Sequence, residues 1–251
     1  MRIKFVIPFP LAGEALQARA DQIPPGLLRP EVEVSFATVR NWCGKLESQY
    51  ESLLLDAYVA EAGVRAEEEG FDALVMDTVS DSGLAPLRAR LSIPVIGPGQ
   101  VAFHLATVLG KRFSVVTMWD RWRHFYNKSF AEYGIEHAVA SVRSLGETPD
   151  VERLFAGKEH EMAERLVQVG RQAIEEDGAD VIVLGSTTMH QAAAHMAAAL
   201  PCPVINPGPV AVKLAEAIVD LGLSHSKLAY PAPGAIQDAK LFSLVGADGL
   251  P

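Results

Sequence analysis

The chain carries two hydroxyl residues, Thr78 and Ser186, at the ends of the apolar runs DALVMDT (72–78) and DVIVLGS (180–186). His190 follows Ser186 by four residues, so a helix that begins directly after the serine would place the imidazole and the hydroxyl on one face. That pair is the minimum for an activated serine nucleophile, and His190 is also a candidate general base because imidazole titrates near neutral pH. Alternatively, Ser186 caps the helix and the histidine packs.

Asp77 places a carboxylate directly before Thr78. A desolvated carboxylate at this position can act as a general base or hold a water molecule. The alternative is that Asp77 braces the loop by accepting backbone amides, and Asp81 is interpreted as the cap of the following helix. The reactive groups expected at this turn are therefore the Thr78 hydroxyl and the Asp77 carboxylate. Asp77 can be either a catalytic base or a brace of the loop.

Both candidate turns belong to one internal repeat. The run at 72–78 recurs at 180–186, and IPVIGPG (93–99) recurs at almost the same offset as CPVINPG (202–208). Each copy closes with an apolar helical segment that ends in glycine, AFHLATVLG (102–110) and AVKLAEAIVDLG (211–222). The repeat predicts two similar lobes around a central cleft, with the two hydroxyl residues at equivalent, facing positions.

We expect lobe one to comprise residues 1–103 and 208–251, and lobe two to comprise residues 104–207. Short runs rich in Val and Ile alternate with helix-like segments, a pattern typical of buried parallel strands in βα units. The fold class is therefore predicted to be α/β, with one parallel sheet in each lobe. The expected strands cover residues 3–8, 32–38, 73–77, 93–97, 112–118, 139–145, 181–185 and 203–206.

Two long helices are expected between these strands. One runs over 48–70, beginning at Ser48 and ending at Gly70. The other runs over 148–178 with a break near Gly157. No low-complexity linker separates the lobes, so their boundaries are predicted from the repeat alone.

In open parallel sheets, ligands bind beyond the carboxyl ends of the strands, where the next helix offers free N–H groups and a positive dipole end. We therefore expect an anion, most simply a carboxylate, at the two hydroxyl turns, held without a lysine or arginine. Trp42, in the loop before residue 48, is the candidate lid. The further candidate contacts of a bound molecule are Val79, Ser80, Thr117 and Thr187.

The composition excludes several classes of partner. The 251 residues carry a formal net charge of −9 and a pI of about 5.3, so no basic field attracts nucleic acid or an anionic membrane surface. No apolar stretch reaches about 18 residues, which predicts a cytoplasmic protein without a membrane span. The histidines, together with Cys43 and Cys202, lack metal-ligand spacing, and no Gly-rich phosphate loop occurs, so no metal or cofactor is expected.

Several segments resemble the aspartate/glutamate/hydantoin racemase superfamily, especially its hydantoin and allantoin racemase branch. The residues that carry the resemblance are AEEEGFDALVMDTVSDSGL (66–84), PVIGPGQVAFHLATVLGKRFSVVT (94–117), EEDGADVIVLGSTTM (175–189) and PVINPGPVAVKLAE (203–216). The resemblance implies two similar α/β lobes around a central cleft that works without a cofactor. In racemases of the superfamily, one cysteine from each lobe flanks the substrate's α-carbon. One thiolate removes a proton, and the other thiol returns one on the opposite face.

This chain has Thr78 and Ser186 where the resemblance implies the two cysteines. An aliphatic hydroxyl would need stabilisation of about 10 kcal/mol to ionise in the range of a thiol, more than a helix terminus supplies. The two-thiol reaction is therefore expected to be absent or severely slowed. The branch also commonly has asparagines at its first strand-to-loop turn, where VIPFP (6–10) places Ile7 and Phe9. This difference predicts a larger or more apolar substrate.

We expect a cofactor-independent enzyme of this superfamily, formally an isomerase, that acts on a small carboxylate or cyclic amide. Two alternatives stay open. The same cleft can carry a hydrolase or lyase reaction that uses Ser186, His190 and an acid, or it can bind a small carboxylate without turnover. The aromatic stretch 119–126 leaves room for a homo-oligomer surface.

Overall fold

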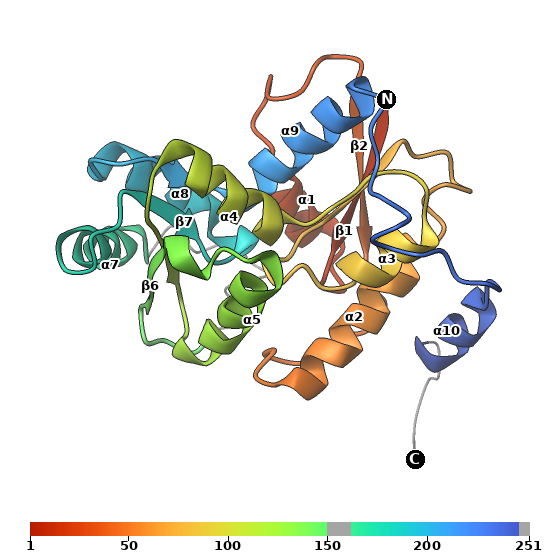
Figure 1. Ribbon diagram of the computed structural model, residues 1–251, viewed down its shortest axis with the longest axis horizontal. Helices are drawn as coiled ribbons and strands as arrows, with labels where there is room; N and C mark the ends of the chain where they lie inside the picture. Colours follow the sequence, from red (N-terminus) through yellow and green to blue (C-terminus); the bar gives the residue numbers. More distant parts are fainter. Residues whose placement is uncertain (150–161, 246–251) are drawn as a thin grey trace. The chain divides into compact units, whose positions relative to one another are not determined.

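The chain forms two four-stranded parallel sheets, each packed against helices, so the predicted α/β class is confirmed (Figure 1). The structure, a computed structural model, describes residues 1–149 and 162–245. Two compact units divide the chain, and each contains one sheet.

Unit one comprises residues 1–11, 25–97 and 211–251. Its strands are hydrogen-bonded in the order β2-β1-β3-β4, and every pair is parallel. The strands are β1 (Arg2–Ile7), β2 (Glu33–Thr38), β3 (Ala73–Met76) and β4 (Val95–Ile96). The helices are α2 (Gln49–Gly63), α3 (Leu84–Arg90) and α10 (Asp238–Val245).

Unit two comprises residues 12–24 and 98–210. Its strand order, β6-β5-β7-β8, repeats that of unit one, again with parallel pairs throughout. The strands are β5 (Phe113–Thr117), β6 (Val139–Ser144), β7 (Val181–Leu184) and β8 (Val204–Ile205). The helices are α1 (Gly13–Ala20), α4 (Pro98–Leu109), α5 (Arg123–Tyr133), α7 (Ala163–Glu175) and α8 (His190–Ala199), with short 3-10 turns η1 (Asp120–Trp122), η2 (Glu136–Ala138) and η4 (Thr187–Met189).

The elements follow the spacing of the sequence repeat. Strand β3 begins at Ala73, and strand β7 begins at the equivalent residue of the second copy, Val181. Helix α4 begins at Pro98, and helix α9 (Pro207–Asp220) begins at the equivalent proline, each after a short strand. The repeat seen in the sequence is therefore a repeat of βα units.

The divisions of the chain differ from the predicted lobes in two respects. Residues 98–103 and 208–210 fall in unit two, and the N-terminal segment 12–24, which contains α1, also belongs to unit two. The repeated segments do not include residues 12–24, so the repeat could not place that segment.

The predicted helix over 48–70 begins where expected but ends earlier. Ser48 is the N-cap, and it forms a capping box with Glu51. The helix itself ends at Gly63. A turn region follows, in which the N–H of Phe71 bonds to the carbonyl of Ala66 shortly before β3 begins. The prediction that this helix reaches Gly70 was wrong.

The second long helix is α7, which ends at Glu175, shortly before Gly178. Gly178 has a φ of 73°, the left-handed conformation expected after a helix end. Most of the predicted region before α7, including the break near Gly157, lies outside the described residues.

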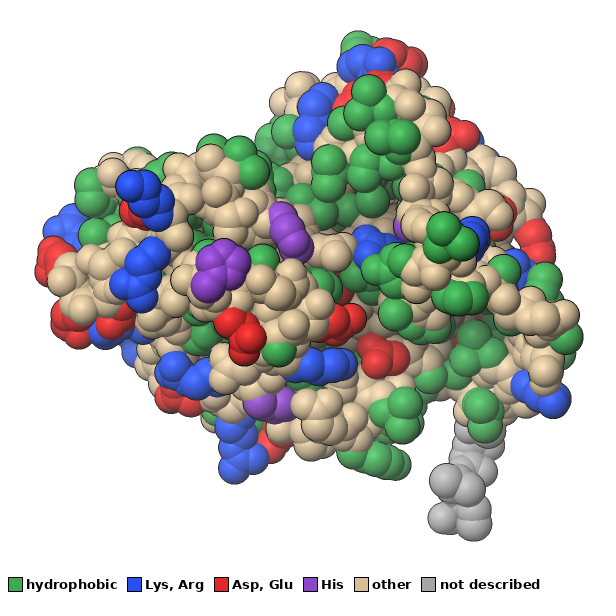
Figure 2. Space-filling view, in the orientation of Figure 1, with side chains coloured by type: hydrophobic (Ala, Val, Ile, Leu, Met, Phe, Trp, Pro, Cys, Tyr) green, Lys and Arg blue, Asp and Glu red, His purple; other side chains and the backbone are tan. Residues whose placement is uncertain are grey.

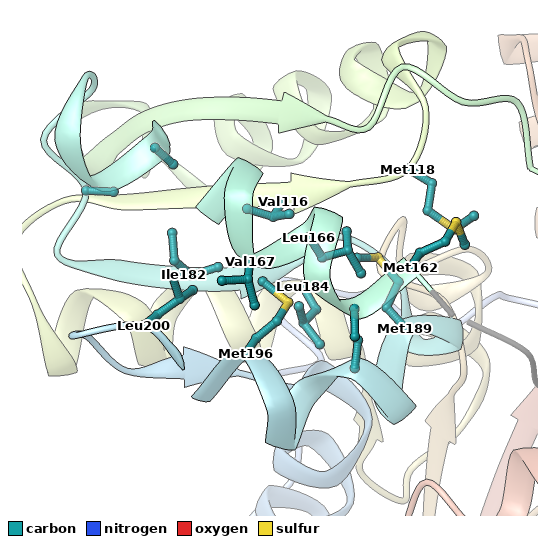
Figure 3. Packing of buried hydrophobic residues seen from close by; sticks show 14 residues of the cluster. Val116, Met118, Met162, Leu166, Val167, Ile182, Leu184, Met189, Met196 and Leu200 are labelled. Atoms are coloured by element: carbon teal, nitrogen blue, oxygen red, sulfur yellow. The ribbon is translucent and has the colours of Figure 1, made fainter. Parts of the chain in front are cut away.

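A buried apolar cluster fixes α7 and α8 against the sheet of unit two (Figure 3). Leu166 of α7 and Met196 of α8 pack with Ile182 of β7, and all three are fully buried. The β7 strand is apolar throughout, as expected for a central strand of a covered parallel sheet. This packing holds the carboxyl end of β7 in place.

The helices and the surface charges concern two classes of partner, membranes and nucleic acids. In the described part of the chain, no helix combines the length and apolar character needed to span a membrane. On the face shown in Figure 2, acidic and basic side chains are interspersed.

Replacing Leu166 with alanine should lower the free energy of unfolding by about 2–5 kcal/mol, because it leaves a cavity in this cluster. Urea denaturation measures the change. The matched control is Leu228→Ala, since Leu228 is 96% exposed and its loss should stay within about 0.5 kcal/mol. Equal effects of the two substitutions would contradict the assigned core.

Candidate functional site

The turn after β3 is anchored to the neighbouring strand and carries a chain of hydroxyl groups. The N–H of Asp77 donates to the carbonyl of Val6, at 2.8 Å, which extends the β1–β3 pairing by one residue. Beyond it, Thr78 Oγ1 lies 2.7 Å from Ser80 Oγ, which lies 3.0 Å from Ser82 Oγ. Thr78 and Ser80 are half-buried, so two linked hydroxyls stand at the surface of this strand end.

The two acidic residues of this turn are both buried. The Asp77 side chain is 1% exposed at the end of β3. Asp81 has a φ of 53°, and a Cβ on Gly97 would lie 2.6 Å from the Asp81 carboxylate. The N-cap of α3 is Gly83 rather than the predicted Asp81. The close approach explains why glycine stands at position 97, because any side chain there would collide with Asp81.

An aromatic pair lies beyond the ends of β1 and β2 in the same unit. The rings of Phe9 and Trp42 are 4.7 Å apart between centroids and tilted by 51°. Both side chains are half-buried, and Trp42 also packs on the apolar cluster of unit one. Phe9 and Trp42, which the sequence suggests separately as substrate contacts, thus form one apolar surface.

The turn after β7 repeats the hydroxyl arrangement. The N–H of Gly185 donates to the carbonyl of Val116 at 2.8 Å, as Asp77 does in unit one. Ser186 Oγ lies 2.8 Å from Thr188 Oγ1 and accepts from the Thr188 N–H at 3.3 Å. Ser186 therefore caps η4, while its hydroxyl pairs with a second hydroxyl two residues later, as that of Thr78 does.

A buried tyrosine fixes the backbone immediately before Ser186. The Tyr126 hydroxyl donates to the carbonyl of Gly185 at 2.7 Å and lies 2.8 Å from Thr117 Oγ1. Burial raises the pKa of Tyr126, so the hydroxyl stays protonated as a donor. A Cβ on Gly185 would lie 2.7 Å from both the Tyr126 hydroxyl and Thr117, so only glycine fits. Thr117, a predicted substrate contact, is therefore a partner of Tyr126 inside the unit.

His190 and Ser186 are not brought into hydrogen-bond contact. Among the described residues, the Ser186 hydroxyl bonds within its own turn, whereas His190 Nδ1 lies 3.3 Å from Arg19 Nη1 and 3.2 Å from the Thr187 carbonyl. Arg19 comes from α1, is 3% exposed, and also donates to the Thr187 carbonyl at 3.1 Å. The structure therefore pairs the histidine with a buried arginine to which no sequence motif points.

Three of the predicted contact residues lie inside the protein. The side chains of Val79, Thr117 and Thr187 are buried, whereas Ser80 is half-buried beside Thr78. These three positions are therefore not open to a bound molecule.

The two cysteines do not supply the thiols that are absent from the turns. Burial raises the pKa of Cys43 to about 11, and burial also raises the pKa of Cys202. Both therefore stay protonated thiols at neutral pH. In the described residues, no group of three or more His, Cys, Asp or Glu side chains is arranged to hold a metal ion.

Comparison with known proteins gives consistent matches. The family model described as Asp/Glu/Hydantoin racemase matches residues 10–215. A hydantoin racemase from Pseudomonas sp. (strain NS671) is 34% identical over 200 residues, which cover 80% of this chain and 79% of that protein.

Solved structures of allantoin racemases have the same fold. The enzyme from Pseudomonas fluorescens has a TM-score of 0.84 at 29% identity, with 94% of this chain and 99% of that chain covered. The enzyme from Klebsiella pneumoniae has a TM-score of 0.82 at 28% identity, with 94% and 96% covered.

Tyr126→Phe should lower the free energy of unfolding by about 1–3 kcal/mol, because the buried Gly185 carbonyl and Thr117 hydroxyl lose their partner. Chemical denaturation gives the value. Tyr50→Phe is the control, since Tyr50 is 71% exposed and should be neutral. A neutral result at Tyr126 as well would contradict the bracing role.

The pKa of His190 is lowered to about 4, first by burial and then by the charge of Arg19. A lowered folded-state pKa means that stability is full above the unfolded value of about 6.5 and falls as pH drops toward 4. His190→Gln should therefore flatten the pH dependence of unfolding in this window by about 1–3 kcal/mol.

Urea denaturation at several pH values tests this expectation. His104→Gln serves as the control, because His104 lies exposed on α4. An unchanged slope in the His190 variant would show that this ring is not protonated less readily in the folded state.

Proposed function

Because the chain belongs to the Asp/Glu/hydantoin racemase family, we propose that it is a cofactor-independent isomerase-type enzyme that acts on a cyclic amide or a small carboxylate. The carrying observation is the pair of equivalent hydroxyl turns, Thr78 with Ser80 and Ser186 with Thr188. These turns follow central strands, where parallel sheets bind ligands. Each turn is proposed to contact substrate.

The relatives favour the cyclic amide. They are named for hydantoin and allantoin, which share an amide ring with an acidic C–H next to a carbonyl. The aromatic pair of Phe9 and Trp42 supports a substrate whose ring carries an apolar substituent, because it offers carbon surface where a smaller polar substrate would need donors.

The hydroxyls are proposed to bind rather than to carry the proton. Neither Thr78 nor Ser186 is acidic enough to replace a thiol at neutral pH, and the side chain bonded to each is another hydroxyl, not a base. Asp77, a carboxylate buried next to Thr78, is the proposed base on that side. The two-thiol reaction is proposed to be lost.

Two other functions use the same turns. A serine hydrolase or lyase would need His190 to approach Ser186, and the observed partners of the two side chains do not favour it. Binding without turnover is favoured by the absence of cysteine at positions 78 and 186. An exchange measurement separates binding from catalysis.

We expect α-proton exchange of 5-benzylhydantoin in deuterated water to rise at least about 100-fold in the variant Thr78→Cys/Ser186→Cys, because thiols ionise in the working range. NMR spectroscopy follows the loss of the C–H signal. The matched control, Thr107→Cys/Ser243→Cys, makes the same changes at exposed positions and should leave the rate unchanged.

Faster exchange in the double-cysteine variant, with the control pair unchanged, would support substrate binding at these turns. A folded variant that binds the hydantoin without faster exchange would refute it. Wild-type exchange that already equals the variant rate would refute the expectation that rapid exchange at these turns needs thiols.

Trp42→Ala should weaken binding of 5-benzylhydantoin about 10-fold and change binding of unsubstituted hydantoin little, because only the benzyl ring needs the apolar surface. Isothermal titration calorimetry gives both affinities. Trp122→Ala, at another half-buried tryptophan, is the control and should affect neither. Equal weakening for the two ligands would contradict the assignment.

A further inference from the structure

Arg19 lies in an unusual place for an arginine. Its side chain is 3% exposed, although arginine is almost never fully buried without specific partners. One Nη1 atom reaches both the Thr187 carbonyl, at 3.1 Å, and His190 Nδ1, at 3.3 Å. The guanidinium therefore holds both the backbone and the imidazole of the turn after β7.

This contact favours one tautomer of His190. An arginine keeps all its protons in proteins and can only donate, so Nδ1 accepts if this contact is a hydrogen bond. The Thr187 carbonyl lies 3.2 Å from Nδ1 and could accept from an Nδ1–H group, but that tautomer would place the Nδ1 proton beside the cationic guanidinium, 3.3 Å away. The tautomer that accepts from Arg19 carries its proton on Nε2.

In this tautomer the Nε2–H group lies at the same turn. The contacts of the ring with Arg19 and with the Thr187 carbonyl are both at Nδ1. The ring is half-buried and begins α8, one turn after the Ser186 hydroxyl. A donor thus stands beside the hydroxyl turn with its other nitrogen fixed by Arg19.

We propose that His190 acts as a neutral hydrogen-bond donor, through Nε2–H, to a carbonyl oxygen of the substrate, and that Arg19 is the positioning residue that fixes this tautomer. This proposal rests on the proposed function. It assigns His190 the opposite of the general-base role, because the lone pair that a base would use is turned toward Arg19.

Removal of a proton from a carbon next to a carbonyl explains why a hydrogen-bond donor such as the His190 Nε2–H would be useful. When the α-carbon gives its proton to a base, the electron pair of the broken C–H bond moves into the carbonyl group, and the oxygen gains negative charge. A donor already in place stabilises that oxygen without releasing its own proton.

The surroundings keep the ring in this form. Arg19 and Asp21, both of the N-terminal segment that contains α1, are the charged groups that act on it, and burial together with Arg19 lowers the pKa of His190 to about 4. At neutral pH the ring is therefore uncharged.

The tautomer is tested without any substrate. NMR spectroscopy of protein labelled with ¹⁵N-histidine should show His190 as the Nε2–H tautomer at pH 7. Arg19→Leu, which removes the donor, should shift the ring partly to the Nδ1–H tautomer, whereas Arg19→Lys, which retains a charged donor, should preserve the wild-type form. A wild-type Nδ1–H tautomer, or an unchanged tautomer in Arg19→Leu, would overturn the positioning role.

The donor role is tested with 5-benzylhydantoin as the probe. His190→Gln retains an N–H near the Nε2 position, and His190→Leu removes it, so we expect affinity to fall about 10-fold in the leucine variant and less than about 3-fold in the glutamine variant. Equal losses in both variants, or none in either, would overturn the donor role. Failure of the wild-type protein to bind any hydantoin would overturn the proposed function itself and the donor role with it, while the tautomer result would still stand.

Discussion

Parallel pairing of the central strands is the constraint on which both turns depend. In a parallel pair the carboxyl ends lie at one edge, and one extra backbone bond, from Asp77 to Val6 or from Gly185 to Val116, carries the pairing into the turn. The next residue is then forced out of the sheet with its side chain at the edge. Thr78 and Ser186 stand at this position in their units, so their equivalence follows from the strand geometry.

The same backbone carries different chemistry in the two units. Gly185 is required because Tyr126 and Thr117 occupy the space of a side chain, whereas the equivalent Asp77 brings a carboxylate into its turn. A guanidinium and an imidazole stand behind the second turn. One strand end therefore carries a carboxylate and the other lies beside neutral and positive donors, so the two repeated turns differ in their chemistry.

The strands and the repeat could be predicted from the sequence because buried parallel strands are continuous apolar runs, and all eight expected strands are present. The sequence does not predict helix α1, because the helix is weakly apolar and Arg19, its one buried residue, is charged. The partners of Tyr126 and His190 could not be predicted, because Gly185 and Arg19 are far from them in the chain. Local spacing places residues on a turn, but tertiary packing decides which atoms they bind.

The hydroxyl group at each strand end is bonded to another hydroxyl of the same turn. Thr78 is held by Ser80, and Ser186 by Thr188, so neither arrangement requires a residue of the other unit. A change at one strand end can therefore be accepted without a compensating change at its counterpart. The repeat thus provides two turns whose local hydroxyl contacts can vary separately.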